Sequence, residues 1–263
     1  MIIDCHTHVF PDKIAERAID SLSMVSGGLE PHYNGTVRGL LKRMDEDGVD
    51  KSIVLNIATN AHQMQHVNDF ASSINHDRII SFGSVYPDAP DVMDELERIK
   101  ELGLKGVKFH PEYQSFFVDD EKMRPIYKKI GELGLVTVFH AGSDLGFKPP
   151  FHCTPDRAVK ILPWFDAPVV FAHWGGWLYA EEVEKTLAGT EAYFDLSFGY
   201  GSIPRHYALK IVEKHGTEKL LLGSDGPWHT IPMELRLMDT LGLTNEEKEK
   251  IYHQNAEKLL KLH

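Results

Sequence analysis

The stretch ELGLKGVKFH at residues 101–110 returns as ELGLVTVFH at residues 132–140. In both copies a helical segment ends near a glycine, and a short apolar run that follows it ends on a histidine. A joint between a helix and the next strand that recurs in this way is typical of repeated βα units. The two copies therefore predict neighbouring strands of one parallel sheet.

Short β-branched runs of this kind occur eight times along the chain, each followed by a turn and a helical pattern. The predicted strands are Ile2–Cys5, Ser52–Ile57, Ile79–Val85, Gly106–His110, Val136–His140, Val169–His173, Ala192–Ser197 and Leu220–Ser224. An open doubly wound sheet would usually carry a glycine-rich phosphate loop, and the sequence has no GxGxxG motif. The length of 263 residues favours a closed (β/α)8 barrel, the TIM barrel, as one domain over residues 1–263.

Helix boundaries and one long connection complete the predicted pattern. Gly103 ends one helix, Thr154 precedes a proline at the start of another, and Thr244 and Glu247 have the spacing of a capping box. The excursion at residues 9–36 is rich in Gly, Ser and Pro. We expect it to form a lid over one end of the barrel.

Composition excludes several classes of function. The 39 acidic residues outnumber the 28 basic ones, which gives a net charge of −11 and no basic block for nucleic acid or an anionic membrane. No signal peptide or membrane-length apolar run is visible, and Cys5 and Cys153 do not form a disulfide framework. We expect a cytoplasmic protein with a small-molecule substrate, with a homodimer as the commonest default.

Ionisable residues gather at the carboxyl ends of the predicted strands. Five of the fifteen histidines lie there together with one lysine and one aspartate. These residues are His6, His8, Lys108, His110, His140, His173 and Asp225. In a closed parallel barrel these ends form a single ring, where active sites lie. Buried groups of this kind are costly without partners, so a shared cation is the favoured interpretation over separately satisfied core histidines.

The set Asp4-x-His6-x-His8, His140, His173 and Gly223-Ser224-Asp225 resembles the amidohydrolase superfamily. The segments GVKFHP, FHAG, AHWGG and GSDGPW are most similar to its amidohydrolase-related branch of metal-dependent hydrolases and decarboxylases, and the resemblance covers the whole chain. It implies that His6, His8, His140 and Asp225 bind a metal. It also implies that Asp225 and His173 are catalytic, with His173 beside the metal.

Lys108 and His110 have two possible roles under this resemblance. In binuclear members a carboxylated lysine from the fourth strand bridges two metals, whereas in the mononuclear branch that residue is left to bind substrate. We favour one divalent ion, Zn²⁺ on ligand type with Mn²⁺ or Fe²⁺ as alternatives. Lys108, His110 and Trp174 are then expected to contact the substrate.

The chemistry that follows is hydrolysis of a small amide, lactone or related carbonyl compound by a metal-activated water. The alternative is decarboxylation of an aromatic or muconate-type acid with the same ligands, for which flanking aromatic residues could receive a flat substrate. Those residues are Phe10, Trp174, Trp177, Phe198 and Trp228. A non-catalytic metal-binding barrel is a third hypothesis, which the presence of both Asp225 and His173 disfavours.

Two other families share the HxH opening. The polymerase-and-histidinol-phosphatase phosphoesterases usually continue HTH with Ser-Asp-Gly, whereas Val9-Phe10-Pro11 follows here. TatD-like nucleases place a glutamate where this chain has Lys108. We expect loops at 9–36, 141–153 and 226–232 to select the substrate, and His32 and His152 lie on loops that could reach it.

Overall fold

The computed structural model describes residues 1–262, and its strands form two parallel sheets. The strands are β1 (Ile3–Thr7), β2 (Lys51–Leu55), β3 (Ile79–Phe82), β4 (Gly106–Phe109), β5 (Val136–Phe139), β6 (Val169–Phe171), β7 (Tyr193–Asp195) and β8 (Leu220–Leu221). One sheet has the order β1-β2-β3 and the other β4-β5-β6-β7-β8. Strand order therefore follows chain order, as in a barrel.

Contacts at two seams close the ring. Gly83, which follows β3, forms a parallel bridge with Val107 of β4, and Thr7 of β1 forms one with Gly226 beyond β8. At the second seam the amide of Cys5 also donates to the carbonyl of Leu222 at 2.8 Å. The prediction of a closed TIM barrel is thus confirmed.

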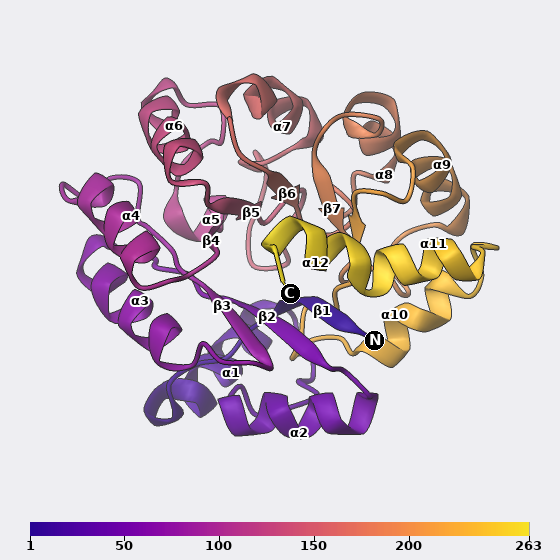
Figure 1. Ribbon diagram of the computed structural model, residues 1–263, viewed down its shortest axis with the longest axis horizontal. Coiled ribbons are helices and arrows are strands. Elements are labelled where there is room, and N and C mark those ends of the chain that lie inside the picture. The colour runs from indigo at the N-terminus through magenta and orange to yellow at the C-terminus, as the bar shows by residue number, and fades with distance from the viewer. Residues whose placement is uncertain (263) are drawn as a thin grey trace.

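Helices surround the barrel, as Figure 1 shows. The α-helices are α1 (Asp12–Val25), α2 (Val37–Asp47), α3 (Met64–Ser73), α4 (Val92–Glu101), α5 (Pro111–Gln114), α6 (Arg124–Leu133), α7 (Pro155–Ile161), α8 (Ala180–Glu182), α9 (Arg205–His215), α10 (Ile231–Met238), α11 (Asn245–Glu249) and α12 (Asn255–Leu260). Short 3-10 turns are η1 (Ala61–Gln63), η2 (Glu121–Met123) and η3 (Leu162–Trp164), and π-helical turns are η4 (Val183–Leu187) and η5 (Lys250–Gln254). No helix within residues 1–262 is long and apolar enough to span a membrane.

Alternation along the strands produces two apolar layers. Inside the barrel, residues such as Ile53 and Val138 pack with Leu259 and Leu260 of α12. In Figure 1 α12 runs across the barrel, and its apolar side chains close that end. The outer layer lies between strands and helices and contains Phe109, among other aromatic residues. With one end filled by α12, the opposite end is left for a site.

Several helix signals are confirmed. Gly103 follows α4 with φ +75°, a conformation in which glycine avoids the clash that a Cβ would cause. Thr154 precedes α7 and its first-turn proline. Thr244 and Glu247 form the complete capping box of α11, with each side chain accepting from the other residue's backbone N–H.

Every predicted strand after the first ends one to three residues earlier than expected, and β6 and β8 show the reason. β6 stops at Phe171 and β8 at Leu221, whereas the predictions ran to His173 and Ser224. His173 has φ +58° and Asp225 has φ +69°, a left-handed conformation that ends a strand. Both polar residues therefore lie on the turns above the barrel.

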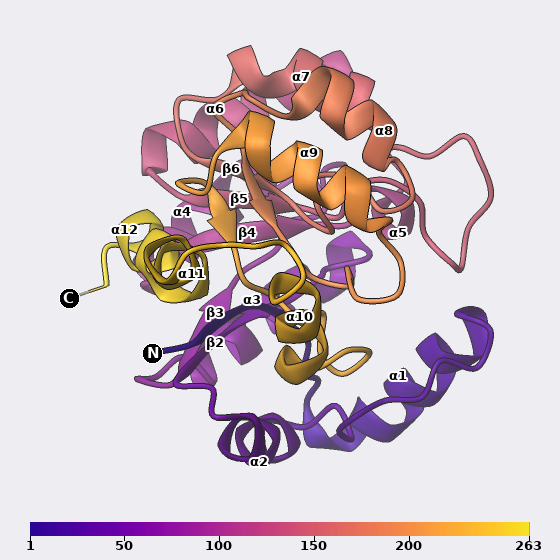
Figure 2. The same cartoon turned by 90° about the vertical axis from the view of Figure 1, so that its right-hand side faces the viewer.

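The connection at residues 9–36 contains α1, a helix that the Gly, Ser and Pro content had obscured; most of those residues belong to the segment after it. Figure 2 shows α1 and the loop between β5 and α7 projecting on the same side of the barrel, away from both termini. Several residues of this connection line the cavity at that end. This placement matches the expected lid.

Candidate metal centre

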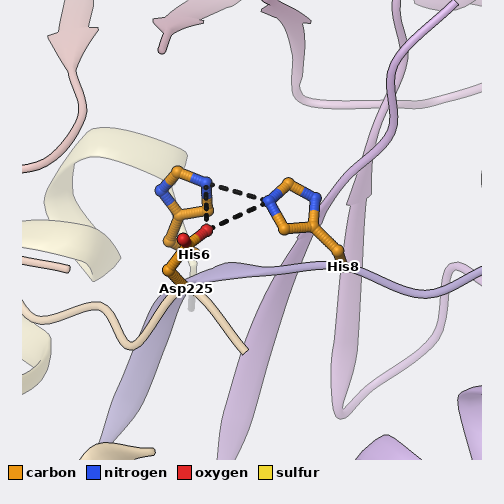
Figure 3. Close-up of side chains that lie close together, drawn as sticks. All are labelled: His6, His8 and Asp225. Atoms are coloured by element: carbon orange, nitrogen blue, oxygen red, sulfur yellow. Dashed lines mark hydrogen bonds and ion pairs between the residues drawn. The ribbon is translucent and has the colours of Figure 1, made fainter. Parts of the chain in front are cut away.

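Three side chains from the first and last strand ends converge at the mouth of the barrel (Figure 3). His6 Nε2 lies 3.2 Å from His8 Nε2. Asp225 Oδ1 lies 3.3 Å from His6 Nε2 and 3.2 Å from His8 Nε2. These three atoms form a nearly equilateral triangle, so three of the predicted metal ligands are brought together.

A bulge in β1 turns these histidines toward the mouth. Between Asp4 and Thr7, β1 advances one residue more than β2, because Asp4 pairs with Ser52 and Thr7 with Val54. Such a bulge re-aims the side chains that follow it. Cys5 can therefore pack inside the barrel while His6 also faces its mouth.

Hydrogen bonds fix which nitrogen of each ring faces the triangle. His8 Nδ1 donates to the carbonyl of Leu55 at 2.9 Å, and His6 Nδ1 donates to Asp195 Oδ2 at 2.8 Å. Each Nε2 then presents a lone pair rather than a proton. A carboxylate or carbonyl that holds the second nitrogen is the usual support of a metal-binding histidine.

The donor set of the triangle fits a divalent cation. Two lone pairs and a carboxylate oxygen repel one another at 3.2–3.3 Å unless a positive charge lies between them. Donors about 2.0–2.1 Å from one ion at tetrahedral angles are separated by about 3.3 Å, which matches the triangle. Burial alone would raise the pKa of Asp225, but His6, His8 and Lys108 bring it below its ordinary value. The carboxylate is therefore ionised.

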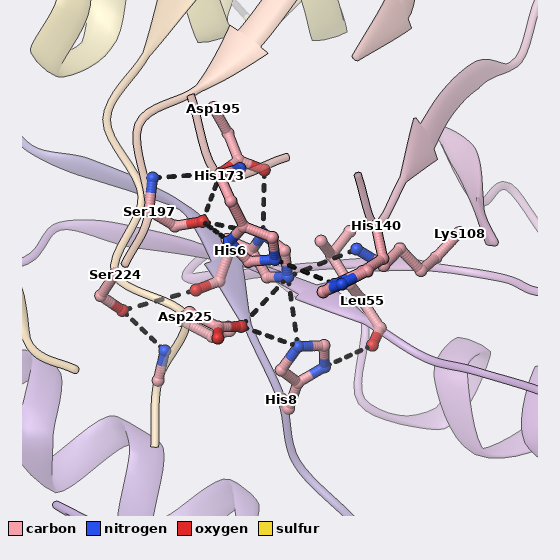
Figure 4. A network of polar contacts seen from close by, with 12 residues as sticks. His6, His8, Leu55, Lys108, His140, His173, Asp195, Ser197, Ser224 and Asp225 are labelled. Atoms are coloured by element: carbon pink, nitrogen blue, oxygen red, sulfur yellow. Dashed lines mark hydrogen bonds and ion pairs between the residues drawn. The ribbon is translucent and has the colours of Figure 1, made fainter. Parts of the chain in front are cut away.

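Asp195 and Ser197, which the sequence interpretation missed, connect the triangle to His173 (Figure 4). Asp195 Oδ1 accepts from the backbone amides of His173 at 3.2 Å and Ser197 at 3.1 Å, and from the Ser197 hydroxyl. Ser197 Oγ contacts His173 Nδ1 at 2.9 Å. Their position at the carboxyl end of a strand, two residues apart like His6 and His8, is the sequence signal that could have revealed them.

His140 contacts His173 and is not grouped with the three donors of the triangle. His140 Nδ1 is 3.1 Å from His173 Nε2, and His140 Nε2 donates to the carbonyl of Ser143 at 2.9 Å. Its imidazole lines the same cavity as the three donors without belonging to their triangle. The structure therefore brings three of the four predicted ligands together, and the fourth, His140, contacts His173 instead.

Lys108 and His110 line the cavity, where a substrate could reach them. Lys108 Nζ is 3.4 Å from His6 Nε2, and burial lowers the pKa of the lysine to about 8. His110 Nε2 is 3.3 Å from Asp144 Oδ2. Burial lowers the pKa of His110 to about 3, so this imidazole is neutral.

Trp174 does not line the cavity, contrary to the expectation that it contacts the substrate. Its side chain is 2% exposed and packs in the outer hydrophobic layer against Gly199. The reason is the backbone, since Trp174 has φ +61° directly after His173 and turns away from the mouth. Trp177 lies on the wall instead. His32 and His152 also lie outside the wall, and His152 Nδ1 donates to the Pro111 carbonyl.

A cavity of about 470 Å³ opens above the triangle. Its wall includes Phe10, Trp177, Phe198 and Trp228, together with lid residues of α1. The loops predicted to select the substrate all contribute, through residues 9–29, Asp144 and Pro227 among others. This volume lies within the usual range for small-molecule sites.

The family model described as Amidohydrolase matches residues 3–262, and the chain belongs to this family. No curated protein matches the chain. A 2,6-dihydroxybenzoate decarboxylase structure is 16% identical with a TM-score of 0.74, covering 99% of both chains. A dihydroxybenzoic acid decarboxylase from Polaromonas sp. JS666 with bound manganese is 14% identical, with a TM-score of 0.74 over 99% of this chain and 97% of that one.

A probable 2-pyrone-4,6-dicarboxylic acid hydrolase from Acinetobacter baumannii is also similar in fold. It is 19% identical with a TM-score of 0.69, and the alignment covers 99% of each chain. At these identities the similarity extends to the barrel architecture alone. The family and the barrel together confirm the resemblance that the sequence motifs carry.

Proposed function

We propose that this protein is a metal-dependent hydrolase of a small carbonyl compound such as a lactone, ester or amide. The observation that carries the proposal is the triangle of His6 Nε2, His8 Nε2 and Asp225 Oδ1, three lone-pair donors within 3.3 Å of one another on the floor of a cavity. A divalent ion held there would supply Lewis acidity toward water and toward a carbonyl oxygen.

The protein's own groups are arranged to support hydrolysis. The ionised carboxylate of Asp225 can accept the proton that an attacking water loses. His173, held by Ser197 and through its backbone amide by Asp195, can polarise the scissile carbonyl. The Lys108 ammonium, 3.4 Å from His6 Nε2, adds positive charge beside developing negative charge.

Zn²⁺ is the proposed ion, because two imidazoles and a carboxylate are donors that zinc favours. Mn²⁺ and Fe²⁺ share these donors, and the similar decarboxylase from Polaromonas holds manganese. We propose one ion per chain, with Lys108 left to meet the substrate. Metal analysis of the purified protein should find about one equivalent, whereas two would indicate a binuclear centre.

Decarboxylation of an aromatic acid is the second candidate. It is favoured by the aromatic wall of Trp177, Phe198 and Trp228, which suits a flat ring, and by the named activities of two of the similar structures. In that reaction the bond between the ring and the carboxylate breaks, CO₂ leaves, and the ring carbon takes a proton. Asp225 would then act as the proton carrier.

One screen separates the two candidates. Metal-loaded protein is offered lactones, esters and amides while acid release is followed by pH-stat, and aromatic acids while CO₂ is collected. We expect acid release that disappears in Asp225→Asn, with Asp119→Asn, a partly buried carboxylate paired with Arg157, as the matched control. CO₂ release without acid release would replace hydrolysis by decarboxylation, and full activity of Asp225→Asn would refute its role.

A further inference from the structure

Polar and apolar side chains are segregated within the cavity. The floor is formed by the strand ends and the turns after them, which carry five imidazoles, an ammonium and a carboxylate: His6, His8, His110, His140, His173, Lys108 and Asp225. Farther out the wall is mainly apolar, with neutral polar groups such as Thr59 and Gln63 at intervals. A ligand that fits both zones has a polar reactive end and an apolar body.

The lid contributes an apolar stripe to the outer wall. Ile14, Ala18 and Leu22 line the cavity at four-residue spacing, which places them on one face of α1. Ala15 and Ile19, on the neighbouring face, are buried in the protein and hold the helix in place. Ile14 is 41% exposed although it is apolar. The stripe therefore presents apolar surface that a ligand would remove from water.

The cavity has further apolar lining residues and a large volume. Val67 and Phe70 of α3 also line the cavity, and Leu145 contributes from the loop after β5. A cavity of roughly 150 Å³ is sufficient for one benzene ring. The cavity here measures about 470 Å³, so a single six-membered ring would leave most of it unfilled.

The permanent positive charge that faces the cavity lies on its floor. Among the described wall residues Lys108 is the single ammonium, and none is an arginine. His66 lies on the wall but is exposed, where a charge pair contributes little. Asp144, also on the wall, would repel an anion. A second carboxylate on the ligand body would thus lose water without gaining a partner.

We infer that the substrate carries at most one anionic group, at its reactive end, and an apolar body longer than one six-membered ring that lies along α1. This inference deepens the proposed function and rests on it for the position of the reactive end. It disfavours dicarboxylic substrates. The apolar stripe of α1 is accordingly a specificity determinant.

Simple carboxylates test this inference by binding alone, since carboxylic acids are products of hydrolysis and substrates of decarboxylation. Isothermal titration calorimetry on zinc-loaded protein would compare butanoate, octanoate and octanedioate. We expect octanoate to bind at least about tenfold more tightly than butanoate, because its additional methylene groups leave water. Octanedioate, which has the same length, should bind at least about tenfold more weakly than octanoate.

Two variants of one helix locate the effect. Leu22→Asp should remove the advantage of octanoate over butanoate, because it places a charged group where the apolar chain of octanoate would lie. Met24→Asp is the matched control, because Met24 is 80% exposed on the same helix and does not line the cavity. Leu22→Ser, a milder change, should reduce the advantage if Leu22→Asp impairs folding as judged by circular dichroism.

The outcomes separate the inference from the proposed function. Equal binding of octanedioate and octanoate, equal binding of octanoate and butanoate, or no binding by any probe would overturn the inference. An unchanged octanoate preference in both Leu22 variants would also overturn it. Failure of the proposed function is read separately, from butanoate binding that does not respond to metal removal and from the turnover screen.

Discussion

At the residue scale, the site depends on which nitrogen of each histidine is free. Asp195 decides this for His6, because its carboxylate accepts from Nδ1 at 2.8 Å and leaves Nε2 for the metal. Three other hydrogen bonds to Asp195, from the two amides and the hydroxyl described above, keep the carboxylate in that position. Asp195 is therefore a positioning residue for the metal centre.

Replacement of Asp195 should weaken metal binding without loss of the fold. Asp195→Asn keeps the shape and removes the charge that supports His6, and changes of this kind usually cost about 10–100-fold in metal affinity. Competition with a chromophoric chelator measures the affinity, and Asp119→Asn is the control. An unchanged affinity would contradict the assigned role.

His215 provides a pH prediction far from the metal centre. Its ring stacks on Phe194 with centroids 4.1 Å apart, and Nδ1 accepts from the amide of Gly189. Burial, assisted by Lys219, lowers the pKa of His215 from 6.5 to about 4. Between these values the unfolded chain binds a proton that the folded protein does not, so stability falls as the pH falls through this range.

His215→Asn removes this proton while its amide oxygen can still accept from Gly189. We expect the free energy of unfolding of the wild type to decrease more steeply than that of the variant between about pH 6.5 and about pH 4. Urea denaturation at a series of pH values provides the comparison. Parallel curves for the two proteins would show that His215 titrates normally.

The sequence predicted residues of the site better than their orientations. His6, His8 and Asp225 were recognisable because HxH and GSD follow apolar runs. The bulge after Asp4 and the left-handed φ of Trp174 depend on pairing with other strands, which a single sequence does not express. For this reason Trp174 was expected on the cavity wall and Trp177 occupies it.

At the element scale, β4 shows how tightly neighbouring strands pack. A Cβ on Gly106 would lie 2.3 Å from the Val136 carbonyl oxygen of β5 and 2.4 Å from the Phe82 ring of β3. These contacts leave no room for a side chain. The strand itself was predicted from its apolar run, but the need for glycine within it follows from the facing strands.

Gly106→Ala should therefore destabilise the protein by about 3 kcal/mol or more, as expected of overpacking against backbone. Gly48→Ala is the matched control. Gly48 has φ +69° and open space around its Cβ position, so only backbone strain of about 1 kcal/mol is expected. Chemical denaturation measures both. Similar losses for the two variants would mean that β4 and β5 can separate to admit a methyl group.

At the scale of the whole molecule, the metal centre lies on the seam between the first and last strands. Backbone contacts there include the amide of Asp225 with the His6 carbonyl at 2.8 Å and the amide of His8 with the Gly226 carbonyl at 2.7 Å. The candidate ligands come from β1 and from the turn after β8. An ion held by His6, His8 and Asp225 would join residues that are far apart in the sequence and would close the barrel more firmly.

Metal binding should accordingly stabilise the entire fold. A ligand that binds only the folded protein adds about 2.7 kcal/mol at a concentration of 100 Kd. For a chain of this size that corresponds to a rise in Tm of roughly 5–10 °C. Thermal denaturation of chelator-treated protein with and without added Zn²⁺ measures the rise. His8→Ala removes one of the three donors of the triangle. This variant should show little rise in Tm on addition of zinc, because only two donors remain. A Tm that is independent of zinc in the wild type, or an equal rise in His8→Ala, would place the metal away from this seam.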